Sequence, residues 1–342
     1  MTRLLLLGGG HAHALVLREF RNFVSTELKV TLVTPGPVHV YSGMVPGVVA
    51  GHYPAAQAQI DLARLARDAG AELILGRVLR LDADAKQAVL ENGDTISYDY
   101  VSLNLGSVPG GLVAPAVAVK PFEEFFDRWR KLLVAGPKTP RIAVAGAGAG
   151  GVELAMAMKF ALDRRGDGGS VELFSDRLAF PTGLADRVRN ALDARSIPLH
   201  LNTKITSGFE ATFWATGAAA LPLVRKSGLK TDERGFVLID PSLRSVSHPD
   251  VFAAGDTASL EGAALPKSGV YAVRQAPVLA ENLKRVVRGM AMLDYTPQPA
   301  SLSLISCGAR YAIASRGGWS AEGQWAWRWK DWLDRRWIVR FR

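Results

Sequence analysis

The stretch Ile142-Ala143-Val144-Ala145-Gly146-Ala147-Gly148-Ala149-Gly150-Gly151 decides the fold, because it joins an apolar run to a run of glycines. The apolar run predicts a buried parallel strand, and residues 152–165 predict a helix. Gly146, Gly148 and Gly151 have the spacing Gly-x-Gly-x-x-Gly, which lets the backbone at a helix N-terminus approach a diphosphate. Between a strand and a helix, this motif predicts a dinucleotide-binding site; the alternative is a glycine turn that holds no ligand.

A second unit of the same kind opens the chain. Residues 3–7 predict a strand, Gly8-Gly9-Gly10 follow, and residues 11–24 and 28–33 predict a helix and a strand. His13 replaces the third glycine, which normally allows the helix to pack closely on the strand. It predicts either a looser crossing or a side chain turned outward, and a ligand-free turn is again the alternative. The two units lie about 140 residues apart, and this internal repeat is stronger evidence than either motif alone.

Composition excludes several classes of protein. The 342 residues are 48% hydrophobic and 21% charged, which is typical of a globular protein with two or three domains. Cys307 is the only cysteine, so neither a dithiol reaction nor a cysteine-rich metal site is available. The histidines lack the i,i+4 pairing of a metal site, and we predict no metal. A single cysteine fits a reducing cytoplasm, which is the localisation we expect.

The net charge of +9 fits nucleic acid, anionic lipid or an anionic cofactor. Outside the last twenty residues no basic run is interleaved with stacking aromatics, so we expect no nucleic-acid partner. Residues 4–7 form too short an apolar run for a signal peptide. No run approaches the roughly 18 apolar residues of a membrane span.

Further elements follow from the apolar pattern. Strands are predicted at residues 72–81, 88–101 with a turn at Asn92-Gly93, 199–201, 211–215 and 251–256, the last ending in Gly-Asp, and helices at 184–195 and 268–288. Both dinucleotide units depart from the rule that an acidic residue at the end of the second strand binds the ribose. The first ends in Thr34, and the second ends in Ser175-Asp176-Arg177, so NADH and NADPH both stay open.

With these elements in place, several segments carry a resemblance to a known family. They are residues 8–13, 41–47, 51–53, 119–121, 215–217, 252–256, 266–272 and the tryptophan-rich tail. On them the chain resembles the pyridine-nucleotide-dependent FAD oxidoreductases. It is most similar to the branch of type II NADH dehydrogenases and sulfide:quinone oxidoreductases, and within it to the flavoprotein module found fused to selenide, water dikinase.

The resemblance implies an α/β fold with two Rossmann-like domains of the glutathione-reductase type, the second inserted in the first. An FAD domain would comprise residues 1–118 and 241–300, and a compact NAD(P)H domain residues 119–240. Residues 301–342 would form a short, helical Trp/Arg-rich tail. The cofactors implied are FAD and NAD(P)H.

The resemblance also implies which residues bind the cofactors. On the FAD side they are Gly8, Gly10, His11, Ala12, Thr34, Ser42, Gly43, Arg77, Val78, Asn104, Gly106, Gly255, Asp256, Lys267, Gly269 and Val270. On the nicotinamide side they are Gly146, Gly148, Gly151, Ser175, Thr216 and Gly217. Ser42 and Gly43 would pass near the isoalloxazine ring, Arg77 and Val78 would border the adenine, and Asp256 would bind the ribityl chain. An ordinary strand-to-turn aspartate is the alternative for Asp256.

Two residues are candidates for catalysis in a direct hydride transfer from nicotinamide C4 to flavin N5. Lys267 would stabilise negative charge near N1 of the reduced flavin, and a solvated lysine is the alternative. Glu153 would lie near the nicotinamide, and a glutamate favoured by the helix dipole is its alternative. Relatives that oxidise sulfide need paired cysteines, which argues against that activity here.

The tail concentrates tryptophan and arginine: Trp325, Trp327, Trp329, Trp332 and Trp337 fall within thirteen positions. In a helix, Trp325, Trp329 and Trp332 share a face, which Arg336 interrupts, and Trp327 points away. Such a face suits a bilayer interface, a homodimer contact or packing on the flavin domain. Family relatives that reduce quinones lie on the membrane through C-terminal helices. By this resemblance we expect the tail to make peripheral contact with the inner face of the membrane.

The nicotinamide half is short. Only residues 202–210 join the strand predicted at 199–201 to the strand predicted at 211–215. The family relatives carry a three-stranded meander at this place, so the affinity of the shortened domain for a nicotinamide nucleotide stays open. Our leading hypothesis is an NAD(P)H-oxidising flavoenzyme that reduces a quinone or similar small acceptor. The alternatives are a soluble reductase serving a protein partner or a selenium-related pathway, and a flavin-binding protein that has lost nicotinamide turnover.

Overall fold

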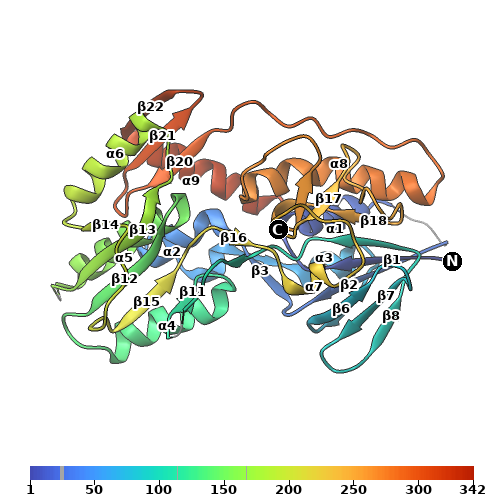
Figure 1. Cartoon of the computed structure of the whole chain (residues 1–342), viewed down its shortest axis with the longest axis horizontal. Coiled ribbons are helices and arrows are strands. Elements are labelled where there is room, and N and C mark those ends of the chain that lie inside the picture. Colours follow the sequence, from blue (N-terminus) through green and yellow to red (C-terminus); the bar gives the residue numbers. More distant parts are fainter. Residues whose placement is uncertain (24–26, 114, 167) are drawn as a thin grey trace.

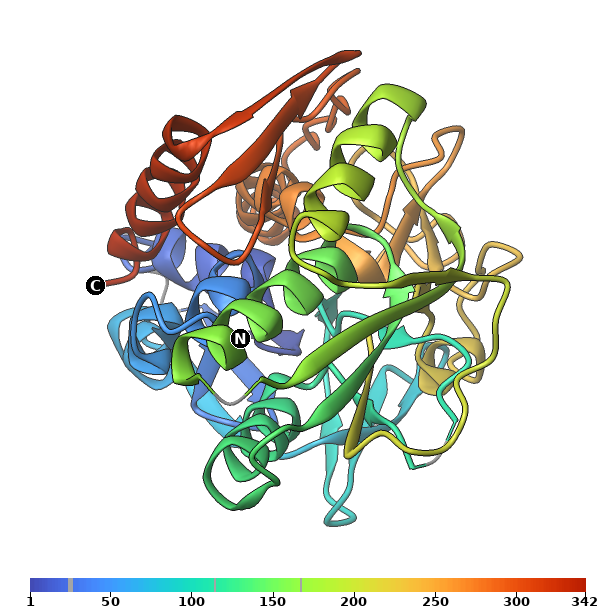
Figure 2. The same cartoon turned by 90° about the vertical axis from the view of Figure 1, so that its left-hand side faces the viewer.

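The computed structural model describes residues 1–23, 27–113, 115–166 and 168–342. Two parallel sheets, each with helices packed on it, form two halves that lie side by side in Figure 1. The C-terminal segment, residues 303–342, runs along both halves (Figure 2). Its helix α9 lies next to the half that contains the N-terminal strand, and its strands lie next to the other half.

The first sheet has five parallel strands in the order β18-β9-β1-β2-β5. They are β1 (Thr2–Leu7), β2 (Leu28–Thr34), β5 (Glu72–Leu75), β9 (Tyr100–Leu103) and β18 (Val251–Ala253). Leu4, Leu5, Leu6 and Leu7 are all buried, as expected for a central strand covered on both faces. Helices α1 (His11–Phe20) and α8 (Gly269–Val287) pack against each other beside this sheet.

The second sheet is also parallel, in the order β11-β15-β12-β13-β14. Its strands are β11 (Val117–Ala118), β12 (Arg141–Ala147), β13 (Ser170–Leu178), β14 (Leu199–Leu201) and β15 (Ala211–Trp214), and its helices are α4 (Phe122–Ala135), α5 (Ala149–Arg165) and α6 (Thr182–Asp193). Each sheet has a hydrophobic core of its own. Because β18 returns to the first sheet after β15, the second domain is inserted in the first, and the predicted fold class is confirmed.

Smaller elements connect the two domains. β10 (Val108–Pro109) pairs with β16 (Ala218–Ala219) where the chain leaves and re-enters the first domain. The remaining sheets are β3 (Val38–Val40) with β4 (Gln59–Asp61), β6 (Val78–Asp82) with β7 (Gln87–Leu90) and β8 (Thr95–Ser97), and β17 (Val237–Ile239) with β19 (Ala258–Leu260). Short helices are α2 (Val45–Val49), α3 (Leu62–Asp68) and α7 (Pro222–Arg225), with 3-10 turns η1 (Ser42–Met44), η2 (Ala55–Ala58) and η3 (Gly255–Thr257).

The C-terminal segment is more than the helical tail we predicted. β20 (Ser303–Ser306), β21 (Ala312–Arg316) and β22 (Trp319–Gly323) form an antiparallel sheet ahead of helix α9 (Gln324–Val339). Over the described residues, no helix is both long and apolar enough to cross a bilayer. The same residues contain no cluster of His, Cys, Asp and Glu side chains suited to a metal ion.

Several strand predictions need correction. The strand predicted at 72–81 breaks at Gly76-Arg77 into β5 and β6, which belong to different sheets. The stretch 88–101 falls in three strands, β7, β8 and β9, and Gly93 makes the predicted turn with φ +91°. Helix α1 ends at Phe20, and the predicted end at Val24 lies outside the described residues.

The outward-turned alternative for His13 is wrong. His13 is fully buried; its Nδ1 lies 2.6 Å from the Gly8 carbonyl oxygen and its Nε2 lies 2.8 Å from Ser102 Oγ. Both ring nitrogens therefore have partners, which offsets the cost of burying an imidazole. Burial lowers the pKa of His13 to about 4, so the ring is neutral at physiological pH.

In the second domain, the described chain from 202 to 210 contains no strand between β14 and β15. The connection is therefore as short as the sequence indicated. The domain boundaries at residues 118, 240 and 300 stay a prediction.

Candidate functional site

The first glycine loop is held against the ends of β9 and β18. Gly8 has φ +92°, and a Cβ there would lie 2.5 Å from the Asn104 carbonyl oxygen. Asn104 Oδ1 accepts a hydrogen bond from the Ala12 backbone N–H at 3.1 Å, and its Nδ2 donates to the Ala254 carbonyl at 2.8 Å. Asn104 thus connects the carboxyl ends of three strands of the first sheet, β1, β9 and β18. Open α/β sheets bind their ligands at this edge.

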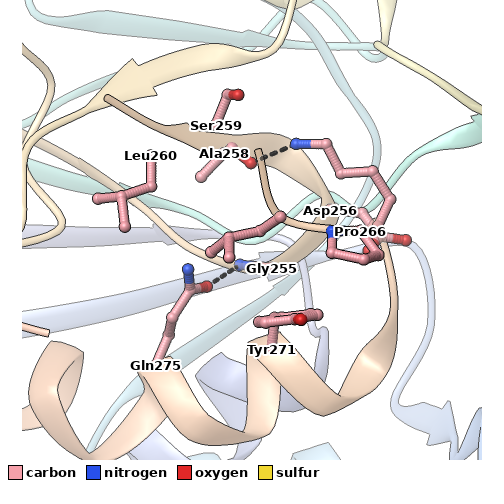
Figure 3. Close-up of a pocket in the computed structure, with 10 residues that line it drawn as sticks. Gly255, Asp256, Ala258, Ser259, Leu260, Pro266, Tyr271 and Gln275 are labelled. Carbon is pink, nitrogen blue, oxygen red and sulfur yellow. Dashed lines mark hydrogen bonds between the residues drawn. The ribbon is translucent and has the colours of Figure 1, made fainter. Parts of the chain in front are cut away.

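Neighbouring contacts extend this edge. The Gly106 N–H donates to Thr257 Oγ1 at 2.9 Å, and the Gly255 N–H donates to Gln275 Oε1 at 2.7 Å (Figure 3). Asp256 is buried and accepts hydrogen bonds from Ser107 Oγ at 3.1 Å and Lys120 Nζ at 3.4 Å.

Thr34 and Arg77 lie together at the far side of the first loop. The Gly76 N–H donates to the Thr34 carbonyl at 2.9 Å, which places the exposed Arg77 and the start of β6 at Val78 beside the end of β2. A Cβ on Gly9 would overlap the side chains of Thr34 and Leu62.

The second loop repeats the arrangement. Gly146 has φ +105°, and a Cβ there would lie 2.5 Å from the Ala215 carbonyl oxygen. A Cβ on Gly151 would overlap the Gly146 carbonyl, whereas Gly148 has open space on its Cβ side. Gly146 and Gly151 thus allow the turn and the close helix packing, whereas the predicted contact of Gly148 with a nucleotide stays a prediction.

The turn after β15 connects the loop to the domain junction. Thr216 Oγ1 donates to the Gly110 carbonyl at 2.5 Å, and the Gly110 N–H donates to the Gly217 carbonyl at 2.8 Å. Near the end of β13, Ser175 Oγ donates to the Arg177 carbonyl at 2.9 Å, and the Arg177 side chain is exposed.

Lys267 lies in a small pocket at the start of α8 (Figure 3). The pocket is lined by Gly255, Asp256, Ala258, Ser259, Leu260, Leu265, Pro266, Lys267, Tyr271 and Gln275. Lys267 Nζ donates to the Ala258 carbonyl and stands 3.8 Å from the centre of the Phe236 ring. Burial lowers the pKa of Lys267 to about 8, although Asp232 and Asp256 act in the opposite direction. Its predicted role beside the flavin stays a prediction.

His11 and Ser42 converge with the first turn of α8. A Cβ on Gly269 would lie 3.4 Å from Ser42 Oγ and 3.8 Å from His11 Nε2. Val270 follows Gly269 and is exposed. Residues predicted to meet the flavin from three distant segments are therefore adjacent in space.

Glu153 faces the C-terminal segment. Glu153 Oε1 accepts a hydrogen bond from the Ser306 backbone N–H at 2.8 Å. Burial raises the pKa of Glu153 to about 7; Lys330 acts to lower it, as does the Ser306 N–H, and Asp334 to raise it. The carboxyl group is therefore poised to gain or lose a proton near neutral pH.

Lys330 and Asp334, both on α9, were not predicted. Their side chains are only 12% and 9% exposed and form an ion pair of 2.8 Å. Lys330 Nζ also donates to the Gly43 carbonyl at 2.7 Å, and the Tyr41 hydroxyl donates to Asp334 Oδ1 at 3.1 Å. Burial acts to lower the pKa of Lys330, but Asp334 and then Glu153 outweigh it, and the pKa is raised. Their i,i+4 spacing did not reveal this, because such pairs are also common on the exposed faces of helices, as at Asp331 and Arg335.

Comparison with known proteins agrees with this arrangement. Residues 2–276 match the pyridine nucleotide-disulphide oxidoreductase family. The chain is 24% identical over 329 residues to the NADH dehydrogenase-like protein YutJ of Bacillus subtilis, with 87% of each chain covered. It is 22% identical to the demethylphylloquinone reductase NdbB of Synechocystis, covering 94% of this chain and 88% of that one.

A solved structure extends the likeness to the C-terminal segment. The sulfide:quinone oxidoreductase of Aquifex aeolicus superposes with a TM-score of 0.81 at 17% identity, covering 100% of this chain and 92% of that one. At this identity the likeness concerns the fold. The narrower resemblance to a module fused to selenide, water dikinase stays a prediction.

The residues present fit the cofactors of the family. In each loop, glycines stand where a Cβ would meet the protein's own backbone or side chains, as at Gly8 and Gly146, and His11 Nε2 is buried beside the first loop without a partner among the described residues. FAD and NAD(P)H are the cofactors of such proteins, as the sequence predicted. The match over residues 2–276 and the two inserted Rossmann-like domains show that the chain belongs to the pyridine nucleotide-disulphide oxidoreductase family.

Proposed function

We propose that this oxidoreductase takes electrons from NAD(P)H through FAD and delivers them to a quinone or a similar small acceptor. The observation that carries the proposal is the position of α9, whose buried Lys330 and Asp334 bond to Gly43 and Tyr41 while Glu153 lies within their electrostatic reach. The C-terminal segment thereby encloses the residues that we predict to lie beside the flavin. The Synechocystis relative is named as a quinone reductase, which supports the same acceptor class.

Titratable side chains of this protein are able to supply the protons that such an acceptor consumes. Reduction of a quinone to a quinol consumes two electrons and two protons, and FAD, when bound, supplies the electron relay between nicotinamide and acceptor. Glu153, with a pKa of about 7, is able to give up and take back a proton at its carboxyl group near neutral pH. Lys330 orients this region by holding the Gly43 carbonyl and the Asp334 carboxylate at the same time.

The outer face of the C-terminal segment suits a membrane surface. Trp319, Trp325, Trp329 and Trp332 are 52%, 46%, 39% and 53% exposed, and neighbouring rings contact one another at centroid distances of 6.3 and 6.4 Å. Trp327 and Trp337 turn inward instead, against His52 and Tyr41. Tryptophan beside arginine is typical of proteins that lie on a bilayer, from which a quinone would be taken.

One alternative has an observation in its favour. The short connection between β14 and β15 makes the nicotinamide domain smaller. A protein that binds flavin but does not oxidise NAD(P)H would not need a full-sized nicotinamide domain. A reductase serving a protein partner shares every cofactor residue and differs only in the use of the tryptophan face.

Anaerobic stopped-flow spectroscopy tests the proposal. We expect NADH or NADPH to bleach the flavin absorbance and a short-chain quinone, added next, to restore it. Failure to bleach at saturating nucleotide would favour the flavin-binding protein. Bleaching that no quinone reverses would favour a protein electron acceptor.

A further inference from the structure

Two histidines from different elements meet beside the first glycine loop. His11 is the first residue of α1, and His39 is the central residue of β3. His39 Nε2 lies 3.2 Å from His11 Nδ1, and the two rings meet edge to face with centroids 4.6 Å apart. The Tyr41 ring contacts His11 from another side at 5.4 Å. The orientation of the His11 ring is therefore fixed.

Both rings are neutral at physiological pH. Burial lowers the pKa of His11 to about 4 and the pKa of His39 well below its ordinary value, and the charge of Lys120 acts in the same direction on both. Each neutral ring carries one proton, so only one of the two facing nitrogens is a donor. If His39 Nε2 carries its proton, His11 must carry its own on Nε2, pointing away from His39.

That second nitrogen of His11 has nothing to bind in the described chain. His11 Nε2 is shielded from solvent and has no hydrogen-bond partner there, and an unpaired buried polar group is unfavourable. The residue itself is the first of the ten-residue helix α1, directly after the glycine loop, and its Nε2 lies 3.8 Å from where a Cβ on Gly269 would stand. A helix N-terminus attracts an anionic oxygen, and such an oxygen would give Nε2 its missing partner.

We propose that His11 Nε2 donates a hydrogen bond to the diphosphate of FAD, and that His39 is a positioning residue that holds His11 in the tautomer required. His11 contributes a directed donor and no charge. The negative charge of the diphosphate is met by the N-terminus of α1, because Lys120 is engaged with Asp256 at 3.4 Å. The proposal rests on FAD as the cofactor of the first domain and is independent of the electron acceptor.

Binding to the apoprotein tests the donor. Flavin fluorescence would give the Kd of FAD, with ADP as a competing probe of the adenosine diphosphate half and riboflavin as a probe of the half without the diphosphate. We expect His11→Ala to weaken FAD and ADP about 10- to 100-fold, as for one hydrogen bond to a charged group, and to leave riboflavin unchanged. His11→Gln, which keeps an N–H donor, should recover most of the FAD affinity. Unchanged FAD affinity in His11→Ala, or an equal loss for riboflavin, overturns the proposal.

The positioning role of His39 has its own readout. His39→Gln keeps a donor toward His11 Nδ1 and should bind FAD like the unmodified protein, whereas His39→Leu removes it and should weaken FAD several-fold. His248→Ala, at a partly buried histidine that pairs with Asp84, is the matched control and should change neither value.

Nitrogen NMR of the intact holoprotein decides the tautomer without any substitution. We expect the shifts of an unprotonated Nδ1 and a protonated Nε2 for His11. The opposite tautomer overturns the proposal even where the variants fail to fold. A protein that binds FAD through His11 and yet is not reduced by NAD(P)H would refute the proposed function and leave this inference standing.

Discussion

The hydroxyl of Tyr41 donates a hydrogen bond of 3.1 Å to the carboxylate of Asp334, a residue 293 positions further along the chain. This bond joins the segment that precedes Ser42 and Gly43 to the C-terminal helix. Burial raises the pKa of the Tyr41 hydroxyl far above its ordinary value, with Asp334 acting in the same direction, so the hydroxyl keeps its proton and stays a donor. The inner face of α9 is consequently part of the body of the protein, and only its outer face is free.

Asp334→Asn should destabilise the protein strongly. The change removes the ion-pair partner of Lys330, whose side chain is 12% exposed, and removing one partner of a buried ion pair costs about 3–5 kcal/mol. Urea unfolding of the holoprotein would measure the loss. The control is Asp127→Asn, which breaks ion pairs with Arg130 and Lys131 on the surface and should leave the midpoint unchanged. Equal midpoints for the two variants would show that the α9 pair contributes no more than a surface pair.

Glu153→Gln should change how stability depends on pH. The folded pKa of Glu153 is raised from 4.5 to about 7, so its contribution is fully present below the unfolded pKa and is lost as the pH rises through the folded pKa. The neutral glutamine still accepts the Ser306 N–H and escapes this loss. The variant should therefore be more stable than the unmodified protein at about pH 8, on the order of 1–3 kcal/mol, and no more stable at about pH 5.

Urea midpoints across this pH range provide the check. A difference between the two proteins that stays constant with pH would mean that the pKa of Glu153 is the same in the folded and the unfolded protein, which would contradict this prediction.

The two glycine loops could be predicted from the sequence because their requirements are local. Gly146 and Gly151 are needed where the loop meets its own backbone and the strand beside it, and this leaves a short pattern in the chain. The same is true of the apolar strand ahead of each loop. The predicted strand at 72–81 failed because β5 and β6 are both apolar, and only their tertiary partners separate them at Gly76.

The rest of the site depends on contacts between distant segments. His13 can be buried because Ser102, 89 positions away, gives its Nε2 a hydrogen-bond partner. The local sequence around His13 does not indicate this partner. Lys330 and Asp334 looked like ordinary charges of a basic tail. Their burial follows from the docking of α9 on Tyr41 and Gly43, which no local pattern records.

Three alanine substitutions in the second loop should give three different outcomes. Gly151→Ala places a Cβ against the Gly146 carbonyl and should lower both stability and NAD(P)H binding. Gly148→Ala meets open space in the protein and should weaken NAD(P)H binding alone, because the added methyl group stands where the nucleotide approaches. Gly150→Ala, also open and inside α5, is the control and should stabilise by up to about 1 kcal/mol.

Thermal unfolding and nucleotide titration of each variant provide the measurements. Normal NAD(P)H affinity in Gly148→Ala would place the nucleotide elsewhere.

Arg177→Ala should reveal the nucleotide preference. Arg177 is exposed at the end of β13, and Ser175 fixes its backbone through a hydrogen bond of 2.9 Å. An arginine here would bind the 2′-phosphate of NADPH, so we expect kcat/KM for NADPH to fall about tenfold and that for NADH to stay the same. Arg189→Ala, an exposed arginine on α6, is the control. An equal response of the two nucleotides would assign the ribose to Asp176 and favour NADH.

The double substitution Trp329→Ser, Trp332→Ser should release the protein from membranes. The two exposed rings lie on the outer face of α9, and burying an aromatic side chain at a bilayer contributes about 1.5–3 kcal/mol by removing apolar surface from water. We expect the unmodified protein to sediment with vesicles that contain anionic phospholipid and the variant to stay in the supernatant. Leu79→Ser, at a 66% exposed leucine on β6, removes an apolar side chain elsewhere and should sediment normally. If the unmodified protein ignores vesicles but dissociates from dimer to monomer on the double substitution, the tryptophan face is a contact between two copies of the chain.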